Sequence, residues 1–169
     1  MRIRFFCGLI CLFLLSFSLL AQEPRMRYRA NKALYLELGG SGGLTLNFDY
    51  LTTEVDNVKT SVRLGGGLYP ATINGQRKMI PVVPLEFLAF IGKFSGNLEA
   101  GLGYTHRFTN EPTETKYYIT SRLGLRYQKP RGGLMFRIGY VPLFYKDLES
   151  RRRNYTLSPA FALSIGTSF

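Results

Sequence analysis

The sequence predicts an all-β fold, an eight-stranded antiparallel up-and-down β-barrel that crosses a membrane. Three observations predict it. Beyond residue 21, apolar residues alternate with polar or small ones at the period of two that a strand requires. The alternating segments run about 8–13 residues, which is long for ordinary strands and close to the length of a tilted membrane-crossing strand. The chain also ends inside such a segment, on the aromatic Phe169.

The first 21 residues have the layout of a secretory signal peptide. Two arginines precede an apolar run, and the small Ala21 ends the segment before the polar Gln22. The alternative is an N-terminal membrane anchor, but the run is short for a helix of about 20 apolar residues. We therefore expect an exported chain that begins at Gln22, with residues 22–32 as a short segment before a barrel of residues 33–169.

Cysteine use and charge agree with export. Cys7 and Cys11 lie within the signal and follow Phe6 and Ile10, where a lipoprotein signal would have a small residue. The mature chain then has no cysteine, so disulfides cannot stabilise it. Removal of the two signal arginines lowers the formal net charge from +11 to +9. An exported basic protein is expected to meet anionic lipid phosphates rather than nucleic acid.

The rest of the chain divides into eight alternating segments, each of which we expect to be one strand. They cover residues 33–40, 43–51, 59–69, 82–92, 97–108, 116–128, 134–145 and 156–169. Turn-like stretches separate them, namely GGSGG, TTEVDN, PATINGQRKM, GKFSG, TNEPTET, QKPRGG and KDLESRRRNY.

The two faces of these strands differ in composition. One face carries Leu, Val, Ile, Phe and Tyr, whereas the other carries glycine, threonine and charged residues but almost no lysine. Glycine weakens a strand, so a solvent-facing surface rich in glycine is unexpected. Inside an eight-stranded barrel, where only side chains fit, glycine leaves room for long arginines. We therefore expect the polar face to line the lumen.

Eight charged residues on the polar face balance in sign, as buried charges require. They are Glu37, Asp49, Arg63, Glu86, Glu99, Arg122, Arg126 and Arg137. Antiparallel hairpins would bring Glu99 roughly opposite Arg126, and Arg63 near Glu86. We predict that all eight belong to one connected network in the lumen. The alternative, a soluble periplasmic lipocalin-like barrel, would place these side chains outside and the leucines inside.

Tyrosines near the strand ends match the aromatic girdle that membrane barrels place at each lipid–water boundary. They are Tyr50, Tyr69, Tyr104, Tyr117, Tyr127 and Tyr140.

The signal layout, the eight strands and the final FALSIGTSF, with Phe161, Leu163, Ile165 and Phe169 on one face, resemble the small outer-membrane β-barrels of the OmpA/OmpX-like architecture. The resemblance covers the mature chain and is architectural. It implies the outer membrane of a double-membraned bacterium and insertion by the barrel assembly machinery, which reads Phe169 as an assembly signal. It also implies periplasmic termini, a monomer, and outer-membrane lipids and lipopolysaccharide as partners.

That orientation places the GGSGG turn and the loops 70–81, 109–115 and 146–155 at the outer surface. Several prolines then fall at the outer strand ends, where a residue that cannot donate to the ladder is tolerated. They are Pro70, Pro81, Pro84, Pro142 and Pro159.

The sequence favours a non-enzymatic barrel, structural or ligand-binding. A porin is not expected, because paired charges inside eight strands leave no continuous water path. A lipid A-modifying enzyme is the alternative, and it would need His106 beside a serine nucleophile or an acid. The segment reads His106-Arg107-Phe108, and by parity His106 faces lipid, so we expect an interfacial polar residue rather than a catalytic one.

Two interpretations stay open for the run of three arginines at Arg151, Arg152 and Arg153. These arginines either contact lipopolysaccharide phosphates, which arginine binds bidentately, or form a solvated loop with Asp147 and Glu149. The sequence shows no metal-ligand cluster and no cofactor motif.

Overall fold

The computed structural model describes residues 28–73, 75–111, 115–146 and 155–169, and within these ranges it contains ten strands and no helix. The strands are β1 (Lys32–Gly39), β2 (Gly43–Val55), β3 (Val58–Ile73), β4 (Gln76–Ile91), β5 (Gly96–Arg107), β6 (Tyr117–Gln128), β7 (Gly133–Tyr140), β8 (Leu143–Lys146), β9 (Tyr155–Ser158) and β10 (Phe161–Ser168).

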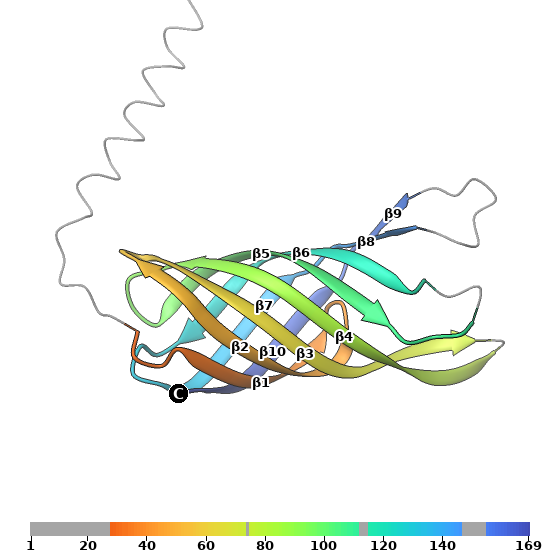
Figure 1. Cartoon of the computed structure of the whole chain (residues 1–169), viewed down its shortest axis with the longest axis horizontal. Coiled ribbons are helices and arrows are strands. Elements are labelled where there is room, and N and C mark those ends of the chain that lie inside the picture. Colours follow the sequence, from red (N-terminus) through yellow and green to blue (C-terminus); the bar gives the residue numbers. More distant parts are fainter. Residues whose placement is uncertain (1–27, 74, 112–114, 147–154) are drawn as a thin grey trace, which may run out of the picture.

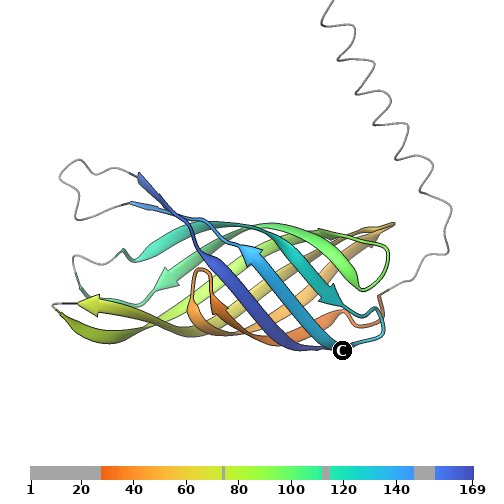
Figure 2. The same cartoon turned by 180° about the vertical axis from the view of Figure 1, so that it is seen from behind.

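All ten strands belong to one antiparallel sheet that closes on itself (Figures 1 and 2). The ring runs β1-β2-β3-β4-β5-β6-β7-β10, and β10 pairs with β1 to complete it. The end of the chain extends this seam, because Phe169 and Lys32 exchange two backbone hydrogen bonds of 2.9 and 3.0 Å. The predicted all-β fold, a closed eight-stranded antiparallel barrel, is therefore confirmed.

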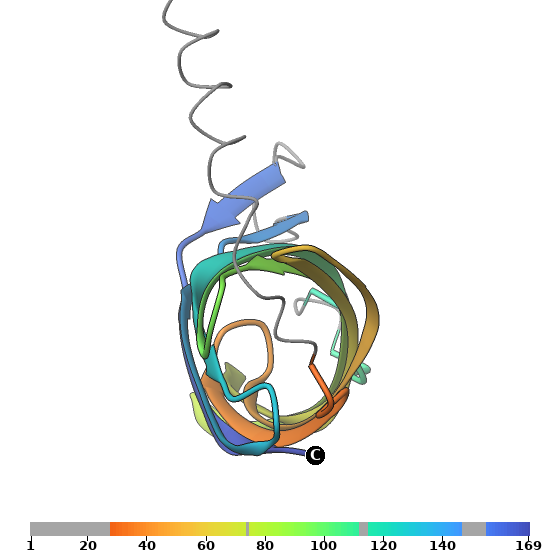
Figure 3. The same cartoon turned by 90° about the vertical axis from the view of Figure 1, so that its left-hand side faces the viewer.

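The seventh and eighth predicted strands are each interrupted by a proline. Residues 134–145 form β7 and β8 with a break that includes Pro142, and residues 156–169 form β9 and β10 with a break at Pro159. Proline has no backbone N–H to donate, so the ladder stops there. Beyond the breaks, β8 pairs with β6 and with β9, and the β8–β9 pair leans away from the ring (Figure 3).

The predicted loop 70–81 is wrong. β3 continues to Ile73 and β4 begins at Gln76, so a long hairpin with a tight turn replaces the loop. Gly75 in that turn has a φ of +76°, which glycine adopts without strain.

Pro70 and Pro81 consequently lie within strands, where proline was expected only at a rim. Pro70 is tolerated because β2 begins at Gly43 and pairs with β3 only as far as Leu68. Among the described residues, the part of β3 beyond Leu68 pairs with β4 alone, so Pro70 lies on an edge strand. Pro84 also lies inside β4, opposite Thr105, and its buried side faces the lumen.

Side chains alternate between the lumen and the outer wall along the strands of the ring, as the parity of the sequence predicts, except near the end of β2, where the register shifts between Leu51 and Thr53. On β1, for example, Glu37 is fully buried whereas its neighbours Leu36 and Leu38 are 51% and 64% exposed. Tyr69 is an exception to the predicted girdle. It occupies a lumen-facing position on β3, where its ring packs on the Arg107 guanidinium.

The β1–β2 turn folds into the barrel, so that Ser41 at its centre is fully buried (Figure 3). Three of its glycines have positive φ: Gly39 at +86°, Gly40 at +61° and Gly43 at +72°. Residues with a Cβ rarely adopt this conformation, so the GGSGG sequence is required for the inward turn. Gly39 also lies so close to the Phe161 carbonyl that a methyl group would collide with it.

We predict that Gly39→Ala destabilises the barrel by about 1–3 kcal/mol, because the substitution adds both backbone strain and a backbone collision. Gly66→Ala is the matched control, since Gly66 on β3 has open space around the position of a Cβ. The measurement is urea unfolding of both variants in detergent micelles. Equal midpoints for the two variants would contradict the prediction.

Candidate functional site

The lumen contains a first cluster of two arginines and two glutamates, which we call the Glu37 cluster. Its members are Glu37 on β1, Arg63 on β3, Glu86 on β4 and Arg122 on β6. Arg63 Nη2 lies 2.8 Å from Glu37 Oε1, and Arg63 Nη1 lies 2.8 Å from Glu86 Oε2. Arg122 contacts the same two carboxylates at 3.0 Å. Each arginine therefore bridges both glutamates across the barrel.

Neutral groups complete the hydrogen bonding of the Glu37 cluster. Asn47 Oδ1 accepts from Arg63 Nε at 3.0 Å and from Nη2 at 2.8 Å, while Ser164 donates to Glu37 at 2.9 Å. Both are lumen-facing residues outside the eight predicted members of the network. Their positions on the polar faces of β2 and β10 could have identified them as lumen-facing.

The second cluster, which we call the Glu99 cluster, lies nearer the end of the barrel that holds the β2–β3, β4–β5 and β6–β7 turns. We call this the short-turn end. Arg126 Nη1 on β6 lies 2.7 Å from Asp49 Oδ2 and 3.3 Å from Glu99 Oε2. Arg137 on β7 donates to the other oxygen of Glu99, with its Nε at 3.2 Å. Arg126 Nε also donates to Gln128 at 2.8 Å. In the described part of the chain, Asp49 Oδ1 and Ser61 Oγ on the same face make no hydrogen bond.

All eight predicted network residues are thus buried in the lumen and ion-paired, but they form two clusters rather than one. Tyr35 on β1 connects them, and it was not predicted as a member. Its hydroxyl accepts a hydrogen bond from Arg137, and its ring centroid lies 5.0 Å from the Arg137 guanidinium and 5.8 Å from that of Arg63. An aromatic face between two cations is favourable for both.

The predicted register holds in one hairpin and is shifted in the other. Arg63 lies directly opposite Glu86. Glu99 lies opposite Gly124 and Arg126 opposite Asn97, so this pair is diagonal. A long arginine side chain still reaches a diagonal neighbour.

The short-turn end of the lumen is closed by the segment before β1. The ring of Tyr28 lies under the Lys59 ammonium at 4.7 Å, and Asn97 donates to its hydroxyl at 3.1 Å. Lys59 in turn donates to the Gly92 carbonyl at 2.6 Å. Burial raises the pKa of the Tyr28 hydroxyl. Neither residue was predicted, because Lys59 faces the lumen at a strand end and Tyr28 precedes the first strand.

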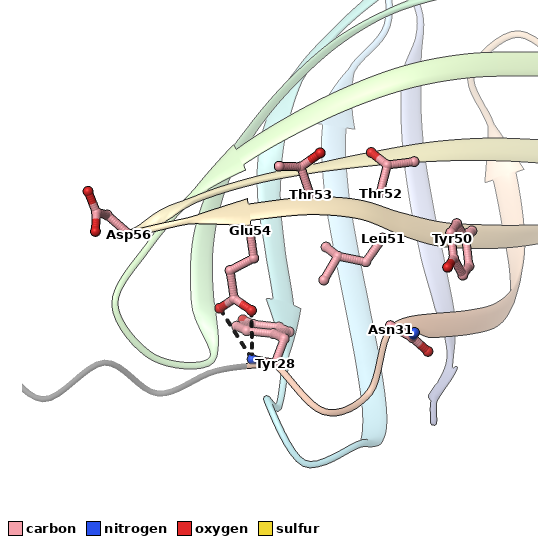
Figure 4. A pocket seen from close by; sticks show the side chains of 8 residues that line it. All are labelled: Tyr28, Asn31, Tyr50, Leu51, Thr52, Thr53, Glu54 and Asp56. Atoms are coloured by element: carbon pink, nitrogen blue, oxygen red, sulfur yellow. Dashed lines mark hydrogen bonds between the residues drawn. The ribbon is translucent and has the colours of Figure 1, made fainter.

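A pocket of about 430 Å³ opens beside this closure, between the Tyr28 segment and the end of β2 (Figure 4). It is lined by Tyr28, Asn31, Tyr50, Leu51, Thr52, Thr53, Glu54 and Asp56. Glu54 accepts hydrogen bonds from the Tyr28 backbone N–H at 3.0 and 3.2 Å, so its carboxylate already holds the closing segment in place.

His106 lies outside the lumen, on the wall formed by β5 and β6, as its parity predicts. The Tyr104 hydroxyl lies 3.3 Å from His106 Nδ1, and the Phe108 ring packs edge-on at 4.7 Å.

The candidate lipid-contact residues Arg151, Arg152 and Arg153 lie outside the described residues, as does the signal segment 1–21. Both interpretations of the run therefore stay open.

The described residues contain no group of three or more His, Cys, Asp or Glu side chains placed to hold a metal ion. They also contain no helix that is long and apolar enough to cross a membrane.

No protein-family model matches the chain, and comparisons with curated proteins and with solved structures give no match.

We predict that Arg126→Ala destabilises the barrel by about 3–5 kcal/mol, because it leaves the Asp49 carboxylate buried without its ion pair. Lys78→Ala is the control. Lys78 is 46% exposed and pairs with Glu111 at 2.8 Å, and such surface pairs contribute less than about 1 kcal/mol. Unfolding in urea measures both, and a small effect at Arg126 would show that the buried pair is not needed.

Proposed function

We propose that the protein is a non-enzymatic integral outer-membrane β-barrel, structural or ligand-binding, whose lumen is closed by the two charge clusters. The observation that carries the proposal is the outer wall. Outward-facing positions from Leu34 to Leu38 on β1, and the corresponding stretches of the other seven strands of the ring, hold no Asp, Glu, Lys or Arg. Most of them are large apolar side chains that are more than one-third exposed.

Such a surface suits lipid rather than water. Soluble proteins rarely expose contiguous apolar patches larger than several hundred Å². A lipocalin-like barrel would need the opposite arrangement, with charges outside and apolar side chains inside. Burial of Arg63 and exposure of its neighbours Val62 and Leu64 argue against that alternative.

The height of the apolar wall fits a bilayer. On β4 it extends from Met79 to Ile91, which is roughly 40 Å along a strand at about 3.3 Å per residue. At a tilt of about 40°, this corresponds to about 30 Å across the membrane, close to the thickness of the hydrocarbon core.

Tyrosines and basic residues support the position of the boundaries. Outward-projecting tyrosines near strand ends are 38–50% exposed, namely Tyr50, Tyr104, Tyr117, Tyr127 and Tyr140. Beyond the apolar wall, Lys and Arg occur at both barrel ends. At the end of the barrel that holds the β3–β4 turn, they include Arg77, Lys78, Lys116 and Lys146. These cations suit the phosphates of lipid and lipopolysaccharide headgroups, and the arginines at 151, 152 and 153 would add to them.

We predict that the mature protein, beginning at Gln22, partitions with the outer membrane and migrates differently on a gel before and after boiling. Closed barrels resist detergent unfolding, whereas boiled chains do not. Cell fractionation followed by such a gel makes both measurements. Recovery of the intact chain in the soluble periplasmic fraction would contradict the proposed membrane location.

We predict that Phe169→Ala reduces accumulation of the barrel in the outer membrane several-fold, because the terminal aromatic residue is proposed to be an assembly signal. Phe161→Ala is the matched control. Phe161 lies on the same outward face of β10, is 73% exposed and sits at the opposite end of the strand. Equal accumulation of the two variants would indicate that Phe169 contributes only apolar surface.

A further inference from the structure

Three hydroxyl oxygens lie in the lumen outside the two charge clusters. They belong to Thr105 on β5 and to Tyr118 and Thr120 on β6, and the three residues are at most 2% exposed. None of the three oxygens has a hydrogen-bond partner in the described part of the protein. Buried hydroxyls are almost always satisfied in folded proteins, because an unmade hydrogen bond is costly.

The three residues are neighbours on the lumen face of β5 and β6. Thr105 lies directly opposite Tyr118, and Thr120 lies opposite Gly103 on the same pair of strands. A Cβ at Gly103 would come within 2.7 Å of Thr120 Oγ1, so the glycine keeps room for this hydroxyl. We call Thr105, Tyr118 and Thr120 the hydroxyl cluster of the lumen.

Two guanidinium groups lie on either side of the hydroxyl cluster along the barrel axis. Toward the Glu37 cluster, the next lumen-facing residue on β6 is Arg122. On the other side, Arg107 is stacked between two aromatic rings, 3.6 Å from the Tyr69 centroid and 4.3 Å from the Tyr118 centroid.

The opposite wall adds a fourth oxygen. Ser41 in the inward β1–β2 turn is fully buried, and its Oγ also has no partner among the described residues. β1 and β2 lie four strands away from β5 and β6 around the ring, so Ser41 enters the lumen from across it.

We propose that the hydroxyl cluster binds internal water. This water would extend the polar part of the lumen from Arg122 outward to Arg107. Each hydroxyl can both donate and accept, and water is the small ligand that does the same. A buried water requires two to four polar partners, and this cluster supplies three. Leu143, paired with Thr120, begins a buried apolar cluster with Val141 and Ala162, so this side of the site is apolar.

The number of waters required is ordinary. Globular proteins hold on the order of one buried water per 27 residues, which is roughly six for a chain of 169 residues. The inference rests on the barrel fold and not on the proposed membrane location, so the two can fail separately.

The test removes one oxygen at a time without changing side-chain shape, in Thr105→Val, Tyr118→Phe and Thr120→Val. Loss of a hydroxyl that is bonded to water lowers stability, whereas loss of an orphaned hydroxyl raises it. We therefore expect a lower urea midpoint for each variant. Thr72→Val, which removes an exposed hydroxyl at the same end of the barrel, is expected to leave the midpoint unchanged.

A direct measurement accompanies the stability series. In the folded protein, NMR cross-relaxation between water and the methyl groups of Thr105 and Thr120 should be observed, and the Thr105→Val variant should retain it at the valine methyls. A raised midpoint in the three variants, or methyl groups without water contacts, would overturn the proposal.

Discussion

The rest of the structure depends on one constraint, that every charge inside a narrow closed barrel must find its partner within the ring. Eight strands leave no room for bulk water, so the four arginines and four carboxylates must neutralise one another. This requirement restricts the register of the whole sheet. A slip of one residue would turn Arg63 or Glu86 toward the outer wall and bring leucines into the lumen. The ion pairs in the lumen therefore form only when the strand register is correct.

Much of the barrel could be predicted from the sequence, because a strand has a period of two and the two faces of each strand differ sharply in composition. The parity that placed Glu37 inside and Leu36 outside is preserved along the strand. Strand lengths were less predictable. Pro70 and Pro81 indicate a loop when each strand is considered alone. Pro70 is compatible with a long hairpin because β2 starts late and leaves that part of β3 as an edge.

The network was predictable as a set of residues but not as an arrangement. Arg122 and Glu37 are 85 residues apart in the chain, and only closure of the ring between β1 and β10 brings them into contact. The role of Tyr35 likewise depends on closure of the ring. Its position on the polar face was visible, but its place between Arg63 and Arg137 depends on which strands face each other across the lumen. Residues such as Tyr28 lie outside any periodic pattern and gave no signal.

The first turn shows how loop length and lumen chemistry are related. GGSGG is short for a loop displayed at a surface, and it folds inward instead, where a Cβ at Gly40 would lie 3.2 Å from Glu37 Oε1. The turn therefore covers the Glu37 cluster from one side, while Tyr28 and Lys59 close the short-turn end. With both closures present, the charged part of the lumen lies between two covers built from the chain itself. Because these covers keep bulk water from the ion pairs, the attraction between the paired charges is less screened and each pair depends more strongly on its partner. The same enclosure argues for a stable scaffold rather than a pore, and it leaves the outer wall and the basic barrel ends as the surfaces through which the proposed function would act.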